Sequence, residues 1–163
     1  MNSIFTRTSI RNFLQQDVED EKITTILKAA MAAPSAVNQQ PWEFVVTKDK
    51  KVMMALAACS PYSTPLKTAT CAFVICYKKD CMVPAYGQID SAISAENMLL
   101  EIENQDLGGV LLGVAPIKKR MEKTKEVLNL DDKLEVFGII ACGYPTQKNA
   151  QQDRFDLNKV HYI

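Results

Sequence analysis

One long helical pattern, over residues 88–107, sets the strongest limit on how this chain can fold. Its apolar residues recur at helical spacing and form a broad stripe: Ile89, Ala92, Ile93, Leu99, Leu100 and Ile102. Small residues, which let a neighbouring helix approach closely, fill much of its first half (Ser91, Ser94 and Ala95). We expect Gly108 and Gly109 to end this helix, because glycine readily takes the left-handed conformation common at helix C-termini.

Shorter helices and strands are interspersed around this long helix. Helices are predicted over residues 23–31, 50–59 and 117–130, and strands over residues 42–47, 72–77, 110–114 and 136–142. The intervals between strands are uneven and one helix dominates, which favours an α+β sandwich over a regular parallel doubly wound sheet. A chain of 163 residues can bury a single core, so we expect residues 1–163 to form one domain.

Charge, cysteine and histidine content exclude several classes of function. Lys plus Arg and Asp plus Glu both number 19, so net charge gives no reason to propose a nucleic-acid or membrane partner. No apolar run approaches the ~20 residues of a membrane span and no signal peptide is recognisable, so we expect a cytoplasmic protein. The five cysteines include no CxxC pair, which favours free, buried thiols and no metal site. The only histidine, His161, lies near the C-terminus, which argues against Ser-His-Asp, Cys-His and zinc-hydrolase chemistry.

Three polar features are candidates for a binding site. Arg7, Ser9 and Arg11 could converge on one anion, because alternate residues of an extended segment point the same way and guanidinium groups suit phosphate. Ordinary surface arginines are the alternative. The loop APSAVNQQPW, residues 33–42, carries uncharged donors and acceptors, which suit either a neutral heterocycle or plain turn formation. Arg154 is able to return to the N-terminal arm, although a lone arginine in a tail is more often solvated.

No intrinsic base, nucleophile or metal cluster is recognisable in the sequence. An enzyme of this composition therefore needs a cofactor to carry the chemistry. A GxGxxG or GxxxxGK[ST] loop is also missing, so a Rossmann-type dinucleotide site and a P-loop have no support.

Four segments, in this order and spacing, resemble the nitroreductase family of flavoproteins: RTSIRNF, PSAVNQQPW, SAISAENMLLEIENQDLGGVLLG and GYP with a following arginine. The resemblance covers nearly the whole chain. It implies an α+β sandwich with a central, mostly antiparallel sheet flanked by helices, which binds FMN non-covalently and acts as a homodimer. The two flavins would lie in clefts formed by both subunits, and residues 88–107 would form the dimer contact.

The resemblance also implies which residues hold FMN. Arg7, with Thr8 and Ser9 beside it, would hold the phosphate, and Arg11 would hold the phosphate, the ribityl chain or the pyrimidine edge. The flavin ring and ribityl chain would be lined by Pro34, Ser35, Ala36, Asn38 and Gln40, with Leu112 and Gly113 packed near the flavin and Arg154 returning to the phosphate. The segment of residues 59–68 matches no family motif, so Lys67 is open as a further flavin contact.

The implied activity is that of an FMN-dependent oxidoreductase that takes hydride from NAD(P)H and passes electrons to a nitroaromatic, quinone or similar small-molecule acceptor. NAD(P)H would leave before the acceptor binds, which gives ping-pong kinetics. Flavin N5 would carry the chemistry, with no catalytic side chain, and Arg11 is the candidate cation that favours the reduced flavin. The alternative is a flavin-binding or sensor-like protein that holds FMN without sustained NAD(P)H turnover, because the chain is short and shows no recognisable nicotinamide pocket.

Overall fold

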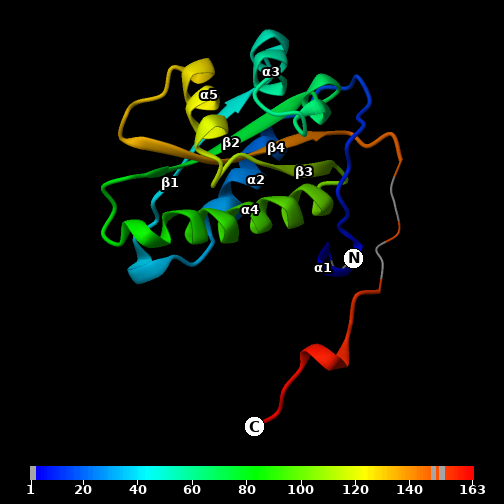
Figure 1. Cartoon of the computed structure of the whole chain (residues 1–163). Coiled ribbons are helices and arrows are strands. Elements are labelled where there is room, and N and C mark those ends of the chain that lie inside the picture. Colours follow the sequence, from blue (N-terminus) through cyan, green and yellow to red (C-terminus); the bar gives the residue numbers. More distant parts are fainter. Residues whose placement is uncertain (1–2, 148–149, 151–152) are drawn as a thin grey trace.

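The computed structural model describes residues 3–147, 150 and 153–163, and in these residues a four-stranded sheet carries helices on both faces (Figure 1). The strands are β1 (Trp42–Thr47), β2 (Cys71–Lys78), β3 (Gly108–Gly113) and β4 (Leu134–Gly143). Their order in the sheet is β1-β2-β4-β3, and each of these neighbouring pairs is antiparallel. The predicted α+β class with a mostly antiparallel sheet is confirmed.

Helices cover the two faces of the sheet in pairs (Figure 1). The α-helices are α1 (Ser3–Thr6), α2 (Asp20–Met31), α3 (Lys50–Ala57), α4 (Gly87–Asn104) and α5 (Lys118–Leu128). Short 3₁₀ turns are η1 (Ala36–Asn38), η2 (Thr64–Lys67), η3 (Pro84–Tyr86) and η4 (Leu157–Lys159). Helices α2 and α4 lie on one face, and α3 and α5 lie on the other. In the part of the chain described here, every helix is too short or too polar to cross a bilayer.

The central strand β2 divides the core into two layers. Phe73 belongs to the same buried cluster as Met98 of α4, whereas the next residue, Val74, belongs to the cluster of Leu56 in α3. This alternation continues along the strand, because successive side chains of a strand point to opposite faces. Both faces of β2 are therefore buried, which explains its continuous apolar sequence.

Helix α4 ends earlier than expected, at Asn104, and the predicted glycine cap is wrong. Gly108 and Gly109 open strand β3 instead, and neither has a positive φ, whereas Asp106 does, with φ 60°. Close packing explains why residue 108 is a glycine. A Cβ on Gly108 would lie 2.8 Å from the Ile10 side chain, so only glycine fits without a shift of its neighbour.

The apolar stripe predicted on α4 is split between two faces of the helix. Ser94 is buried against α2, and its Oγ donates a hydrogen bond to the Ala30 carbonyl at 3.0 Å. Ile89 and Ile93, predicted on the same stripe, are 53% and 37% exposed. The two isoleucines are four residues apart, so they share one exposed face of the helix. An apolar strip, formed by Ile89, Ala92 and Ile93, is therefore exposed along the first half of α4.

Candidate functional site

The N-terminal arm, residues 7–14, runs beside the edge strand β3 and the end of β4. Ser9 forms an isolated parallel bridge with Gly109, whose carbonyl accepts a hydrogen bond from Ile10 N at 3.0 Å. Further along, Leu14 N donates to the Tyr144 carbonyl at 2.8 Å. These attachments fix the backbone on both sides of Arg11 and hence the point from which its side chain starts.

The two predicted arginines have different surroundings. Arg7 Nε lies 3.6 Å from Glu96 Oε1 of α4, so this guanidinium is held by an ion pair. Arg11 is exposed, and its Nη1 lies 3.4 Å from the Ser9 carbonyl. A cavity of about 190 Å³ is lined by Ser9, Ile10, Arg11, Asn12, Thr146 and Gln147. A guanidinium beside hydroxyl and amide side chains suits an anionic group such as a phosphate.

The polar loop between α2 and β1 is shaped by its own side chains. Ser35 Oγ accepts a hydrogen bond from Gln40 N at 2.9 Å, and Gln40 Nε2 donates to Asn38 Oδ1 at 3.1 Å. Part of the polar character therefore serves turn formation, which was the alternative reading of this loop. The side chains of Asn38 and Gln40 are nevertheless exposed, so these uncharged amides also face outward.

Leu112 and Gly113 lie at the end of β3. The side chain of Leu112 is buried, whereas Gly113 is exposed, and a Cβ on Gly113 would meet no atom within 4 Å. An unfilled position of this kind at a strand end can accept a ligand in close contact with the backbone.

Hydrogen bonds of three further residues hold the loop and the end of β3. Sequence reasoning missed Asp90 and Arg120, and it noted Gln39 only as one of the polar side chains of the loop. Asp90 accepts a hydrogen bond from Ala36 N at 3.0 Å, and Gln39 Nε2 donates to Asp90 Oδ2 at 2.7 Å. Arg120 Nη1 donates to the Gly113 carbonyl at 3.2 Å. An acidic residue in the first turn of a helix is common, so nothing in the sequence distinguishes Asp90 from an ordinary exposed carboxylate.

The unmatched segment of residues 59–68 is connected to the same strand end. The Arg120 guanidinium lies 5.3 Å from the centroid of the Tyr62 ring, close enough for a cation–π contact. Lys67, left open as a flavin contact, is exposed, and its carbonyl accepts a hydrogen bond from Lys50 Nζ at 2.6 Å.

Within one chain, the structure brings together only part of the predicted residues. The loop contacts the first turn of α4 through Asp90, whereas Arg7 pairs with Glu96, which is roughly 9 Å further along the helix axis. Figure 1 shows the loop and the N-terminal arm toward opposite ends of α4. Arg154 is exposed, and in the described part of the chain no hydrogen bond or ion pair joins it to the arm.

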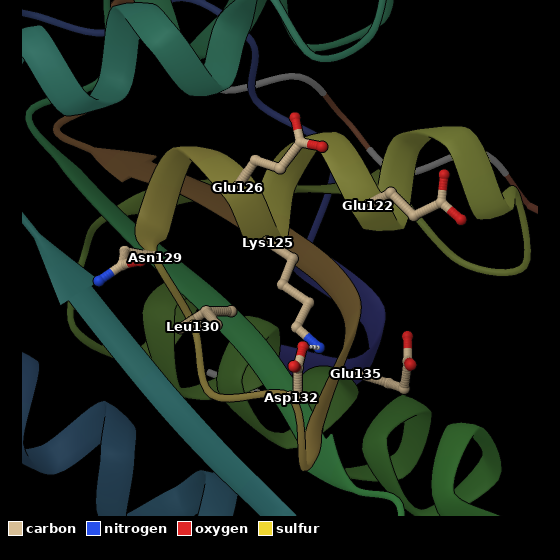
Figure 2. A pocket seen from close by; sticks show the side chains of 7 residues that line it. All are labelled: Glu122, Lys125, Glu126, Asn129, Leu130, Asp132 and Glu135. Atoms are coloured by element: carbon tan, nitrogen blue, oxygen red, sulfur yellow. Dashed lines mark ion pairs between the residues drawn. The ribbon is translucent and has the colours of Figure 1, made fainter.

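A larger cavity, of about 320 Å³, lies between α5 and the start of β4 (Figure 2). It is lined by Glu122, Lys125, Glu126, Asn129, Leu130, Asp132 and Glu135. Lys125 Nζ lies 3.0 Å from Asp132 Oδ1, and this hydrogen-bonded lysine lowers the pKa of the carboxyl group. None of the predicted site residues lines this cavity, and its carboxylates would repel a phosphate-bearing cofactor. We therefore do not assign a cofactor to it.

Comparison with known proteins gives the family of the chain. The profile of the Nitroreductase family matches residues 4–80. A protein of Archaeoglobus fulgidus, provisionally named an NADH dehydrogenase/NAD(P)H nitroreductase, is 34% identical over 166 residues, which cover 99% of this chain and 95% of that protein. This chain belongs to the nitroreductase family. The resemblance inferred from the sequence motifs is confirmed.

Solved structures show that this nitroreductase has the fold of its relatives. A crystal structure from Clostridium acetobutylicum, provisionally described as an NADH oxidase, is 43% identical and superimposes with a TM-score of 0.95, covering 98% of this chain and 97% of that one. An FMN-dependent nitroreductase from Clostridium difficile is 30% identical with a TM-score of 0.92, covering 99% and 97% of the two chains. The two structures extend the likeness over almost the entire chain.

Proposed function

We propose that this nitroreductase is an FMN-dependent NAD(P)H oxidoreductase that reduces a nitroaromatic, quinone or similar acceptor by a ping-pong mechanism. FMN, when bound, would supply the redox chemistry by accepting hydride from NAD(P)H and passing electrons to the acceptor. The main support is the cavity beside Ser9 and Arg11, whose donors suit a phosphate, in a chain that closely matches an FMN-dependent relative.

The residues of the chain would bind and orient the cofactor. Arg7, Thr8 and Ser9 would hold the phosphate, and Arg11 would place a positive charge beside the phosphate, ribityl chain or pyrimidine edge. The open position at Gly113, next to Leu112, would let the ligand approach the end of β3. Uncharged groups of the loop would line the flavin: Pro34, Ser35, Ala36, Asn38 and Gln40.

We further propose a homodimer in which the loop of one subunit completes the site formed by the N-terminal arm of the other. The separation of the loop and the arm within one chain supports this arrangement. The exposed apolar strip of α4 supports it too, because Ile89, Ala92 and Ile93 would be covered by a second copy. The single FMN-binding domain over residues 1–163, the return of Arg154 to the phosphate and the cytoplasmic location stay predictions.

Anaerobic reduction tests the proposed activity. The purified protein should be yellow, and NADH or NADPH should bleach it in the absence of oxygen. Steady-state rates with a quinone and with a nitroaromatic acceptor should give the parallel double-reciprocal lines of a ping-pong mechanism. Bleaching without sustained turnover would support the flavin-binding alternative, and a colourless protein that takes up no added FMN would contradict both.

Substitution of Arg11 tests the assigned binding site. Arg11→Ala should weaken FMN binding by roughly ten- to a hundredfold, because it removes a charged hydrogen-bond donor. Arg11→Lys should retain part of the affinity, since the charge remains and only the forked geometry is lost. Lys119→Ala, which removes an exposed charge on α5, is the matched control and should bind FMN as the unmodified protein does.

A further inference from the structure

The loop between α2 and β1 has an unusual backbone. Val37, Asn38 and Gln40 have φ values of 46°, 55° and 45°, so three non-glycine residues within four positions are left-handed. Such conformations cost about 1–3 kcal/mol each and persist only where the surrounding structure enforces them. The loop therefore needs an external restraint.

Gln39, the residue between these positions, connects the loop to the segment before α4. Its Oε1 accepts a hydrogen bond from Val83 N at 2.7 Å, and its Nε2 donates to the Val83 carbonyl at 3.2 Å. The second hydrogen of Nε2 is directed to Asp90 Oδ2, at 2.7 Å. Both hydrogens of the Gln39 amide are thus directed to acceptors, and its orientation is fixed by Val83.

Asp90 supplies the other half of the restraint. The residue is only 1% exposed, and the two oxygens of its carboxylate accept from Ala36 N and Gln39 Nε2. In the described part of the chain it makes no ion pair, so neutral donors and the positive end of the α4 dipole stabilise it. Burying a charged group costs free energy. A buried carboxylate that accepts hydrogen bonds from two donors of the loop therefore indicates that the position of the loop is important.

We propose that Asp90 is a positioning residue for the cofactor: it holds the loop in the strained shape that presents Asn38 and Gln40 to FMN. This inference rests on the proposed function. Asp90 would not contact the flavin, and it would act through Ala36 and Gln39. Because Asp90 lies on helix α4, which also carries Ile89 and Ile93, it would fix the loop relative to the face that a second subunit would cover.

The geometry explains why an amide at position 90 should not replace the carboxylate. In Asp90→Asn, one oxygen can still accept from Ala36 N, but the new NH₂ group faces the NH₂ group of Gln39. Rotating the Gln39 amide would relieve that clash and would break both of its bonds to Val83. One isosteric substitution should therefore release the loop at Gln39.

The test compares substitutions in the full-length, FMN-loaded protein. Asp90→Asn should raise the dissociation constant of FMN roughly tenfold and change the visible circular dichroism of the bound flavin. Gln39→Ala, at a half-buried position, should have the same two effects. It replaces Asp90→Asn in the test if that variant does not fold. The double variant should bind FMN no more weakly than the weaker-binding single variant, because both substitutions remove the same restraint.

The matched control is Ser94→Ala, one turn further along α4. Ser94 is also buried, and its hydrogen bond to the Ala30 carbonyl joins α4 to α2 without touching the loop. It should lower the melting temperature while leaving the FMN dissociation constant and the flavin dichroism unchanged. Equal effects of Ser94→Ala and Asp90→Asn on FMN, or additive effects of Asp90→Asn and Gln39→Ala, would overturn the assignment. Failure of the unmodified protein to bind FMN would instead refute the proposed function.

Discussion

Val37 has a backbone conformation that its own side chain disfavours. Its φ is 46°, and the left-handed region costs an ordinary residue about 1–2 kcal/mol. The side chain is 63% exposed, so burial does not compensate for this strain. Backbone strain that is not offset by packing is typical of segments that bind ligands.

Replacing Val37 by asparagine should therefore stabilise the protein. Asparagine tolerates the left-handed region, so Val37→Asn should raise the free energy of unfolding by about 1 kcal/mol. Urea denaturation without FMN measures the change. Val37→Thr, which keeps the branched side chain and adds polarity, is the control. Equal stabilisation by both substitutions would show that strain is not its source.

Burial controls the chemistry of the central thiols. It raises the pKa of Cys71 from 9.0 to about 12, chiefly because the thiolate would lose its hydration. The thiol of the unfolded chain ionises at a lower pH than that of the folded protein. The free energy of unfolding that this group contributes below pH 9.0 is therefore lost as the pH rises toward 12. Urea denaturation between pH 7 and 10.5 should show stability falling above pH 9, and less steeply for Cys71→Ala. Identical slopes for the two proteins would contradict this.

At the scale of elements, the sequence predicted strands better than helix ends. Strand β1 has the predicted limits, because Pro41 and the polar residues after Thr47 bound an apolar run. Helix α4 ends three residues early, since Gly108 and Gly109 serve contact with the N-terminal arm rather than a cap. Local patterns report backbone preference, and they do not report which distant segment will pack against a glycine.

Two glycines of β3 should respond differently to alanine. Gly108→Ala should destabilise the protein by about 1–3 kcal/mol, because the added methyl group would press on Ile10 at 2.8 Å. Gly113→Ala, at the open strand end, should change the stability by no more than about 0.5 kcal/mol. Thermal denaturation of the proteins without FMN compares the two.

FMN titration of the same pair separates packing from binding. Gly113→Ala should weaken FMN binding although it leaves the fold intact, since its methyl group would occupy the space proposed for the ligand. Unchanged FMN affinity in Gly113→Ala would argue against a flavin at this strand end.

At the scale of the whole molecule, the sequence motifs predicted the fold, and their resemblance to the family implied a site formed by both subunits, but they did not give the distance between the two motifs within one chain. RTSIR and PSAVNQQPW are separated along α4, and a linear sequence does not reveal that distance. Asp90 escaped prediction for a related reason, because its burial depends on a loop more than fifty residues earlier in the chain. Contacts of this kind arise only once the chain has folded.

The proposed dimer predicts a substitution that affects assembly and cofactor together. Ile93→Glu would place a charge in the apolar strip of α4, so it should convert the dimer to monomers and reduce FMN content. Light scattering after gel filtration and the visible absorbance of the eluted peak measure both properties. Met54→Glu, at a comparably exposed apolar position on α3, is the control. A dimeric, yellow Ile93→Glu protein would refute the assigned interface.

The order of the strands also bears on how the chain must be made. Strand β2 can pair early with β1, but its other neighbour, β4, begins at Leu134, far along the chain. At about 5–20 residues per second, the ribosome needs several seconds to supply β4 after it completes β2. During that interval the most apolar strand of the protein presents an open edge to other nascent chains. Yield in the cell should therefore depend on protection of this strand during translation, independently of how stable the finished enzyme is.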